Sequence, residues 1–384
     1  MQLTGARVAA GPASTNRRDL TIRGGRICLS ITAGQGEREM DLTGYLILPG
    51  LINAHDHLEF NLFPRLGRGI YPNAREWAAD IFHPDVSPVR EHLSIPKPVR
   101  LAWGGLRNLL SGVTTVAHHN PYEQAVFDRN FPVRVIRRLG WAHSLDFSPD
   151  LASRYRDTPH NRPFILHAAE GVDEKAAGEI ARLEQLGVLG PRTVLVHCLA
   201  AVNADVDLLR RRRCSVIWCP DSNLAMFGRT VTDELLQSDI PIALGTDSAL
   251  TFPGDLADAL RTARGRGVTR DSLYRMVTST AADILRLRDG SGSIRQGGVA
   301  DLIAVEDRGQ TPAEALLDLR PSFVMIGGRI RLLSGLPDSG KSLNPIYVEG
   351  RGEFLVDADV AYLNDQARIA LGPDYSLAGR RVAA

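Results

Sequence analysis

The sequence is poor in cysteine, almost free of net charge and without long apolar runs. Its four cysteines (Cys28, Cys198, Cys214 and Cys219) are scattered and form no C-x-x-C pair, so a reduced, cytoplasmic protein is expected. Forty-five Lys and Arg residues against 44 Asp and Glu residues leave a formal net charge of +1, which argues against nucleic acid or an anionic membrane as a partner. No apolar run of about 18 residues is present, so we expect no membrane span. The N-terminus also lacks the apolar segment of a secretory signal.

The two ends of the chain are predicted to form β-structure. Hydrophobic residues make up 44% of the 384 positions, which is enough for a large core and for more than one ordinary domain. Short strands separated by turns are indicated at 2–8, 20–23, 25–31 and 45–48, and again at 301–305, 322–326 and 329–333. We therefore expect residues 1–50 and 290–350 to meet as one small β-domain. In the tail, residues 351–384, the one recognisable pattern predicts a helix near 357–371.

The middle of the chain, residues 51–289, alternates between apolar strands and helical patterns. Buried strands are indicated at 113–117, 164–167, 193–197, 215–219 and 242–245, and helices at 173–186 and 204–212. Repeated strand–helix units over a span of this length favour a parallel α/β barrel.

Reactive side chains follow these apolar strands, at the end where barrel enzymes carry their active sites. Two histidines at positions i and i+2 close the first strand and point to the same side. Further histidines, a glutamate and an aspartate follow three later strands; the full set is His55, His57, His167, Glu170, His197 and Asp247. Neutral imidazoles with a carboxylate suit zinc, or iron, at a hydrolytic site. Each residue alone is typical of a structural role, but their shared place at strand ends indicates one metal centre.

These motifs resemble the amidohydrolase superfamily. The resemblance rests on His55-Asp56-His57, on the His167/Glu170 pair, on His197 and on the run 245–248, Gly-Thr-Asp-Ser, and it favours the branch of cytosine-deaminase-like and triazine-hydrolase-like enzymes. The stretches 219–224, 278–285 and 297–302 agree with it, so the similarity covers roughly residues 1–335. It implies an α/β fold in which a distorted (β/α)8 barrel, residues 51–289, is flanked by a small β-sandwich built from both termini.

The same resemblance implies a role for each site residue. His55, His57, His167 and Asp247 would hold one divalent metal, Zn²⁺ in the first place and Fe²⁺ as the alternative. His197 would polarise the substrate or orient the attacking water, Asp247 would take a proton, and Glu170 would shuttle protons to the leaving or ring nitrogen. A bound divalent metal would supply water activated near neutral pH.

A two-metal branch of the superfamily, which bridges its metals with a carbamylated lysine, is disfavoured. Lysine occurs only at Lys97, Lys175 and Lys341, and none of the three lies between residues 112 and 167, where that strand must run.

Three further histidines are predicted as substrate contacts. His118 and His119 close the strand at 113–117, and His143 is aligned with the end of the fourth strand, which leaves a compressed third strand within 131–137. For His118 and His119 the alternative is a hydrogen bond to a neighbouring loop. His83 and His92 lie in the Pro-rich region 81–98, and we expect them to face solvent or to belong to a lid.

One motif matches a known nucleotide-binding pattern but lacks the structural context that the pattern requires. Residues 335–342 satisfy G-x4-G-K-S, the phosphate-binding loop, but Pro345 and a β-branched run follow where that motif requires a helix. Nucleotide binding is therefore disfavoured. A catalytically silent scaffold is disfavoured as well, because all six reactive groups are present.

The sequence therefore predicts a metal-dependent hydrolase that acts on a non-peptide carbon–nitrogen bond of a small molecule. The first hypothesis is an aminohydrolase, that is a deaminase, of a nitrogen heterocycle. The alternative is an amidase, or a dechlorinase-type hydrolase that removes another leaving group at the same site. No nucleic acid or membrane partner is expected, and a homodimer is expected from the family alone.

Overall fold

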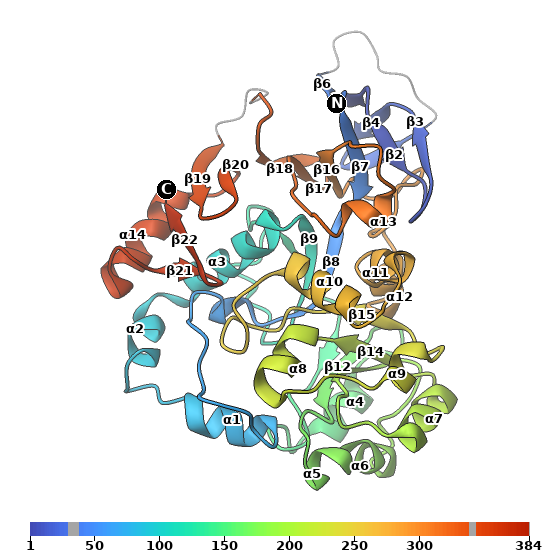
Figure 1. Cartoon of the computed structure of the whole chain (residues 1–384), viewed down its shortest axis with the longest axis vertical. Helices are drawn as coiled ribbons and strands as arrows, with labels where there is room; N and C mark the ends of the chain where they lie inside the picture. Colours follow the sequence, from blue (N-terminus) through green and yellow to red (C-terminus); the bar gives the residue numbers. More distant parts are fainter. Residues whose placement is uncertain (30–37, 338–342, 384) are drawn as a thin grey trace.

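The computed structural model describes residues 1–29, 38–337 and 343–383. Strands from both ends of the chain gather at one end of the molecule, and the inner strands with most of the helices lie at the other (Figure 1). Within the described ranges, no helix has both the length and the apolar character needed to cross a membrane. The predicted α/β class is confirmed.

The terminal strands form two sheets. The larger sheet has the order β21-β22-β19-β20-β18-β17-β16-β7-β2-β3, and the smaller has the order β5-β4-β1-β6. The strands of the larger sheet are β2 (Arg7–Ala9), β3 (Thr15–Arg17), β7 (Tyr45–Pro49), β16 (Leu302–Glu306), β17 (Phe323–Ile326), β18 (Arg329–Leu333), β19 (Asn344–Val348), β20 (Gly352–Val356), β21 (Ser376–Leu377) and β22 (Arg380–Ala383). Those of the smaller sheet are β1 (Gln2–Thr4), β4 (Leu20–Arg23), β5 (Arg26–Cys28) and β6 (Glu39–Asp41).

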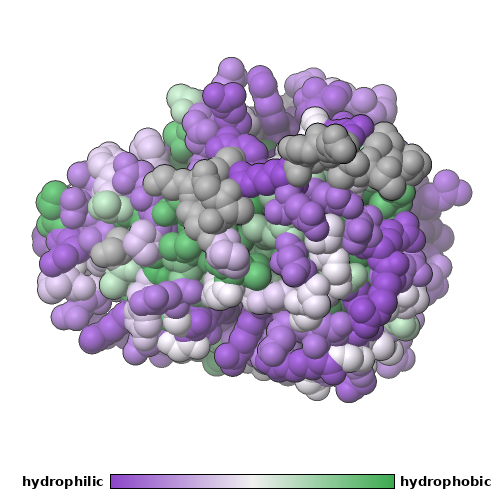
Figure 2. Space-filling view, turned by 90° about the horizontal axis from the view of Figure 1, so that it is seen from above, coloured by the Kyte–Doolittle hydropathy of each residue, from purple (hydrophilic) through white to green (hydrophobic). Residues whose placement is uncertain are grey.

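Both termini contribute to the core between these sheets. Strand β7 pairs antiparallel with β16 over five residues, from Leu302 opposite Pro49 to Glu306 opposite Tyr45. Apolar side chains of both sheets, among them Leu20 and Phe323, pack in one buried cluster. The β4–β5 hairpin turns at Gly24-Gly25, where both φ angles are positive and a Cβ on Gly25 would lie 2.6 Å from the Gly327 carbonyl oxygen. Seen from above, this end of the molecule is largely hydrophilic (Figure 2).

The tail extends the larger sheet. Strand β20 pairs with β19 and β18, and β22 pairs with β19, so the expected domain boundary at residue 350 falls inside the β19–β20 hairpin. The helical pattern near 357–371 is the helix α14 (Val360–Leu371), which packs on α2 and α3. Of the phosphate-loop-like run at 335–342, residues 338–342 lie outside the described residues. The segment that follows it is the strand β19 and not a helix, as the sequence indicates.

Eight short strands in the middle of the chain run parallel to one another. They are β8 (Leu51–Asp56), β9 (Val113–His118), β10 (Arg134–Val135), β11 (Gly140–Trp141), β12 (Phe164–Ala168), β13 (Thr193–His197), β14 (Ser215–Trp218) and β15 (Ile242–Leu244). They pair in the orders β10-β9-β8 and β11-β12-β13-β14-β15. A parallel bridge between Asp56 and Asp247 joins the end of β8 to the segment after β15. In the part of the chain that the structure describes, β10 and β11 are not paired, so the strand pairing leaves the ring open there.

Helices surround these strands (Figure 1). They are α1 (Ala74–Ile81), α2 (Val89–Ser94), α3 (Lys97–Leu110), α4 (Leu151–Asp157), α5 (Glu174–Ala177), α6 (Glu179–Gln185), α7 (Asn203–Arg212), α8 (Pro220–Phe227), α9 (Asp233–Gln237), α10 (Leu256–Gly265), α11 (Arg270–Met276), α12 (Ser279–Ile284) and α13 (Pro312–Ala315), with a 3₁₀ turn η1 at Leu58–Phe60. The helix expected at 173–186 begins at Asp173, whose side chain accepts a hydrogen bond from Ala176 N, and divides into α5 and α6 at Gly178.

Candidate active site

The predicted site residues converge where the parallel strands end. His55 Nε2 lies 3.3 Å from His167 Nε2, and Asp247 Oδ1 lies 3.8 Å from His55 Nε2 and 3.6 Å from His57 Nε2. Two overlapping groups have donor atoms close enough for one metal ion: His55 with His167 and His197, and His55 with His57 and Asp247. All of these residues are buried.

Neighbouring groups fix the orientation of two of these imidazoles. His167 Nδ1 lies 2.8 Å from the backbone oxygen of His143, and His197 Nδ1 lies 2.8 Å from Asn223 Oδ1 on α8. Since both partners accept, each Nδ1 carries the proton and each Nε2 is left with a free lone pair. His197 Nε2 has no hydrogen-bond partner among the described residues.

This donor set fits a divalent metal. A tetrahedral ion with Zn–N bonds of about 2.0–2.1 Å separates its ligands by about 3.3–3.4 Å, close to the observed spacing of His55 and His167. Burial, and then the neighbouring histidines, hold the pKa values of His55, His57 and His167 well below the usual range. These imidazoles are therefore neutral near pH 7, as metal binding requires. The predicted cofactor, one divalent metal held by histidines and an aspartate, matches what these residues can hold.

The backbone is strained where the site residues leave their strands. Ala169, His197 and Asp247 have φ angles of 51°, 75° and 55°, in the left-handed region that non-glycine residues rarely adopt. Asp247 is held there by its Oδ2, which accepts hydrogen bonds from Ser222 Oγ at 2.6 Å and from Thr251 Oγ1 at 3.3 Å. Its other oxygen is thereby directed at His55, on β8, and at His57, directly after β8.

Glu170 faces the cluster from the segment after β12. Its Oε1 lies 3.4 Å from His197 Nε2, and the side chain lines the cavity described below. Burial raises the pKa of Glu170 well above its usual range, and the charges of Asp247 and Glu179 raise it further. A raised pKa favours the protonated carboxyl group, which is the form that can donate a proton.

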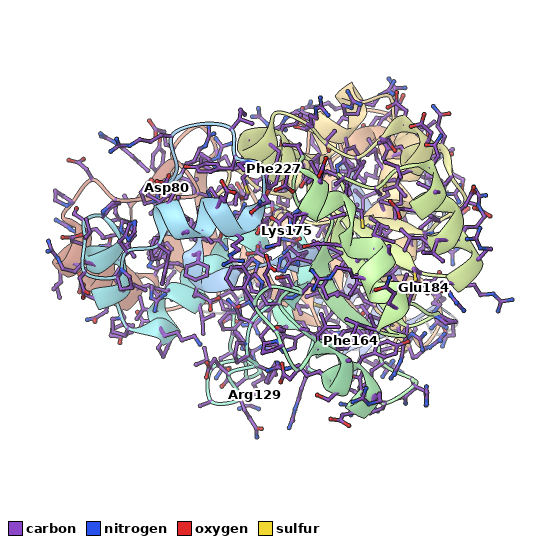
Figure 3. The ribbon with its side chains drawn as sticks, turned by 90° about the horizontal axis from the view of Figure 1, so that it is seen from below. Asp80, Arg129, Phe164, Lys175, Glu184 and Phe227 are labelled. Carbon is purple, nitrogen blue, oxygen red and sulfur yellow. The ribbon has the colours of Figure 1, made fainter. Side chains whose placement is uncertain are left out.

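A cavity of about 650 Å³ opens over these residues. Its lining is mainly apolar, and polar groups come from His57, Glu59, Arg75, Asn120, His143, His167, Glu170, Asp247 and Ser248. The aromatic side chains in the lining belong to Phe60, Trp77, Phe82 and Phe147. Figure 3 views the end at which α1, which carries Asp80, lies beside the segment that carries Lys175. A bridge between Asn73 and Gly171 ties these two segments together.

The three histidines predicted as substrate contacts separate into two kinds. His143 lines the cavity, whereas His118 and His119 are not among its lining residues. His119 Nε2 lies 2.9 Å from the Ala142 backbone oxygen, and His118 Nδ1 accepts a hydrogen bond from Leu58 N. Both therefore bond to neighbouring backbone, which is the alternative that the sequence leaves open.

Of the two alternatives predicted for His92, exposure to solvent is wrong. Its ring lies 4.6 Å from that of Phe63, its Nδ1 lies 2.7 Å from the Pro88 backbone oxygen, and the side chain is buried. A helix, α2, carries His92 inward, and the Pro-rich composition of the region concealed this helix. His83 is exposed.

A buried polar network behind the site was not found from the sequence. Asp56, between the two histidines of β8, accepts hydrogen bonds from five side chains: Asn53, Asn61, Arg107, Asn108 and Thr246. Arg107 Nη1 lies 3.2 Å from Asp56 Oδ2 and also reaches the backbone oxygen of Asp247. The network fixes the ends of β8 and β15 relative to each other. The sequence feature that could have indicated this network is Asp56, an acidic residue between the two histidines of the H-x-H motif.

Comparison with known proteins agrees with this site. Residues 160–331 match the amidohydrolase family. The 5-methylthioadenosine/S-adenosylhomocysteine deaminase of Syntrophobacter fumaroxidans is 26% identical over an alignment of 334 residues that covers 71% of this chain and 74% of that protein.

Two solved structures share the fold. One is a zinc-bound adenosine deaminase from Xanthomonas campestris, with a TM-score of 0.69, 20% identity and coverage of 96% of this chain and 98% of that one. The other is the zinc complex of atrazine chlorohydrolase from Arthrobacter aurescens, with a TM-score of 0.67, 18% identity and coverage of 96% and 99%. The fold is thus of the TIM-barrel type found in amidohydrolases.

The predicted resemblance to amidohydrolases is confirmed by these findings. The predicted enzyme class, a metal-dependent hydrolase acting on a non-peptide carbon–nitrogen bond of a small molecule, is confirmed with it.

Proposed function

We propose that this protein is a deaminase of an amino-substituted nitrogen heterocycle of purine type. The observation that carries the proposal is the pair Glu170 and His197, 3.4 Å apart and directed at a cluster of buried histidines and Asp247. The deaminase from Syntrophobacter fumaroxidans, which acts on adenosine derivatives, supports the purine type. The aromatic lining of the cavity suits a flat ring, and its volume exceeds what a single ring needs.

Each site residue has its own role in the proposed reaction. His55, His57, His167 and Asp247 would hold the divalent metal, which would supply a water activated near neutral pH. His197 Nε2, unpartnered and directed toward Glu170, orients the reacting group. Glu170, whose pKa burial raises, delivers its proton to the ring nitrogen; as a carboxylate it then takes the proton of the new hydroxyl group and passes it to the departing amine. The proton held by Asp247 returns to Glu170 at the end of the cycle. Asp247 Oδ1 accepts the proton released by the attacking water. His143 contacts the substrate from the cavity wall.

We also propose a specific architecture for the two parts of the fold, a barrel and a β-sandwich. The eight parallel strands form a distorted (β/α)8 barrel, and the Asp56–Asp247 bridge supports its closure on one side. The two terminal sheets with their shared core support a β-sandwich built from both ends of the chain. A homodimer is kept as part of the proposal. So is a cytoplasmic location, which the four free cysteines support.

The competing chemistry is the removal of a different leaving group, as in the atrazine chlorohydrolase that shares the fold. Amide hydrolysis uses the same attack on an sp² carbon. Hydrolysis of a chlorinated triazine or of a cyclic amide, at a rate above that for any aminated ring, would favour this alternative.

The decisive experiment is ammonia release from zinc-reconstituted protein, with a chelator-treated control. The panel contains aminated purines and their nucleosides, pyrimidines, triazines and pterins. We expect chelator-sensitive ammonia from at least one purine-type compound. Absence of ammonia from every compound, with bound metal verified, would overturn the proposal and leave the metal site standing.

A further inference from the structure

Two adjoining cavities share Arg75, which takes no part in the chemistry above. This residue lies in the first turn of α1 and lines both the active-site cavity and a smaller pocket of about 20 Å³ beside it. Among the described residues, it is the only arginine or lysine that lines the larger cavity. Because Arg75 is exposed, a ligand that enters the cavity from solvent can reach its guanidinium.

Arg75 differs from the other charged residues of the two linings in having no partner. In the part of the chain that the structure describes, its side chain makes no hydrogen bond and no ion pair. Every other charged side chain of the linings has a polar partner: Glu59 pairs with Asn120, Glu170 with His197, Asp247 with Ser222, Lys175 with Asp146, and Glu179 with Ala169 N. The five N–H donors of the Arg75 guanidinium are therefore available to a ligand.

The helix α1 does not stabilise this cation. A positive charge in the first turn lies at the positive end of the helix dipole. Positions 78 and 79, three and four residues further on, are alanines, so no carboxylate on this helix pairs with Arg75 at those spacings. The two acidic residues of α1, Glu76 and Asp80, lie outside both linings. The helix thus carries its one cation on the cavity side and its carboxylates elsewhere.

The backbone ties Arg75 to the segment of the proton donor. Ala74 N, directly before Arg75, donates a hydrogen bond to the Glu170 backbone oxygen at 3.1 Å. This contact belongs to the end of the molecule at which α1 lies beside the segment of Lys175 (Figure 3). Phe82, directly after the other end of α1, lines the cavity as well. The helix therefore runs along the cavity, with Arg75 at the Glu170 end.

We propose that Arg75 determines substrate specificity: its guanidinium binds an anionic group, a carboxylate or a phosphate, that the heterocycle carries. The inference rests on the proposed deaminase function and narrows its substrate class to heterocycles with a negatively charged substituent. The planar guanidinium matches two oxygens of either group in a bidentate pair. The mainly apolar cavity takes the ring, and the exposed position of Arg75 leaves the anion partly hydrated, so its charge need not be buried.

The test uses two pairs of compounds that differ in one anionic group. Adenosine 5′-monophosphate against adenosine tests a phosphate, and pterin-6-carboxylate against pterin tests a carboxylate. For wild type and Arg75→Met, kcat/KM is measured on the zinc-loaded enzyme and Kd by calorimetry on the chelated protein. Methionine keeps a long side chain and the helix propensity but removes the charge. We expect Arg75→Met to lose about 10-fold on the anionic member of at least one pair, relative to its neutral partner.

Arg211→Met is the matched control. Arg211 is also an exposed arginine on a helix, α7, but it lies outside both linings. Its replacement should leave the ratios of both pairs unchanged. Arg75→Lys keeps the charge and loses the planar fork, so it should keep part of the preference for the anion, and it provides the test if Arg75→Met fails to fold.

A loss confined to one pair assigns the anion as a phosphate or as a carboxylate. Equal losses on both members of each pair would show that Arg75 acts only on structure and would overturn the inference. Unchanged ratios, or a wild type that binds neither anionic compound, would overturn it as well. If the wild type releases no ammonia, the proposed function fails, and the Kd ratios still decide the role of Arg75.

Discussion

His55 Nε2 lies 3.3 Å from His167 Nε2, although 112 positions separate the two residues in the sequence. One stands on β8 and the other on β12, and Asp247, which follows β15, lies 3.8 Å from the first. Three strands from distant parts of the chain thus bring nitrogen and oxygen donors to one point. Neutral imidazoles crowded in this way, with an aspartate oxygen beside them, are suited to bind a divalent metal.

Removing either His167 or Asp247 should therefore abolish tight metal binding. We expect His167→Ala and Asp247→Ala to lose bound zinc after dialysis, measured by inductively coupled plasma mass spectrometry, and to lose turnover with it. His83→Ala is the control, since His83 is exposed and its Nε2 lies 3.0 Å from the Asp80 backbone oxygen, away from the metal cluster. Stoichiometric zinc in either site variant would refute this ligand assignment.

Glu170→Gln should separate metal binding from catalysis. The amide keeps the shape of the side chain but cannot deliver the proton that the raised pKa retains on the carboxyl group. We expect full zinc content and a fall in kcat of about 10²- to 10⁴-fold, the range typical of general acid–base groups. A variant that turns over at the wild-type rate would place the proton shuttle on another residue.

Glu179 should make stability depend on pH. Burial raises its pKa from the ordinary 4.5 to about 7, and the hydrogen bond from Ala169 N opposes this shift. The folded protein therefore binds this proton more tightly than the unfolded chain does. The free energy of unfolding falls as the pH rises from about 4.5 to about 7, because the folded state must then bury a charge.

Glu179→Gln removes this titration. Relative to wild type, the variant should gain on the order of 1–3 kcal/mol in unfolding free energy at pH 8 compared with pH 5, a figure that allows for the partial exposure of the side chain. Urea denaturation at both pH values, in the same metal state, measures the difference. Glu174→Gln, at an exposed position of α5, should show no such change. A difference of the same sign and size in the control would rule out the buried carboxyl group as the cause.

The sequence predicts the metal cluster well because its residues lie in register with strand ends. A run of three apolar residues that stops at His167 or His197 identifies both the strand and the direction in which the chain leaves it. The same logic predicts His55 and Asp247. The end of a strand can be predicted from neighbouring residues alone, and a single sequence contains that local information.

The acceptors and donors behind the cluster depend on tertiary contacts and could not be predicted in that way. Arg107 is one of two arginines on the amphipathic helix α3, and nothing in its sequence neighbourhood indicates that it contacts Asp56, 51 positions earlier. His92 shows the converse, because its Pro-rich surroundings suggest a loop but form a helix whose inner face is buried. The two short strands β10 and β11 could be placed only roughly, since two residues each leave almost no periodic pattern.

The pair formed by Arg107 and Asp56 also leads to a prediction about stability. Both side chains are almost fully buried, with 4% and 0% of their surfaces exposed. Arg107→Met leaves the Asp56 carboxylate without its only cationic hydrogen-bond partner among the described residues, and breaking a buried pair from one side costs about 3–5 kcal/mol. Arg90→Met breaks the exposed pair with Glu91 and should cost less than about 1 kcal/mol. Because Arg107 also reaches the Asp247 backbone, the first variant should bind zinc more weakly as well, whereas the second should not. Equal unfolding free energies of the two variants would contradict a role for Arg107 in holding β8 and β15 together.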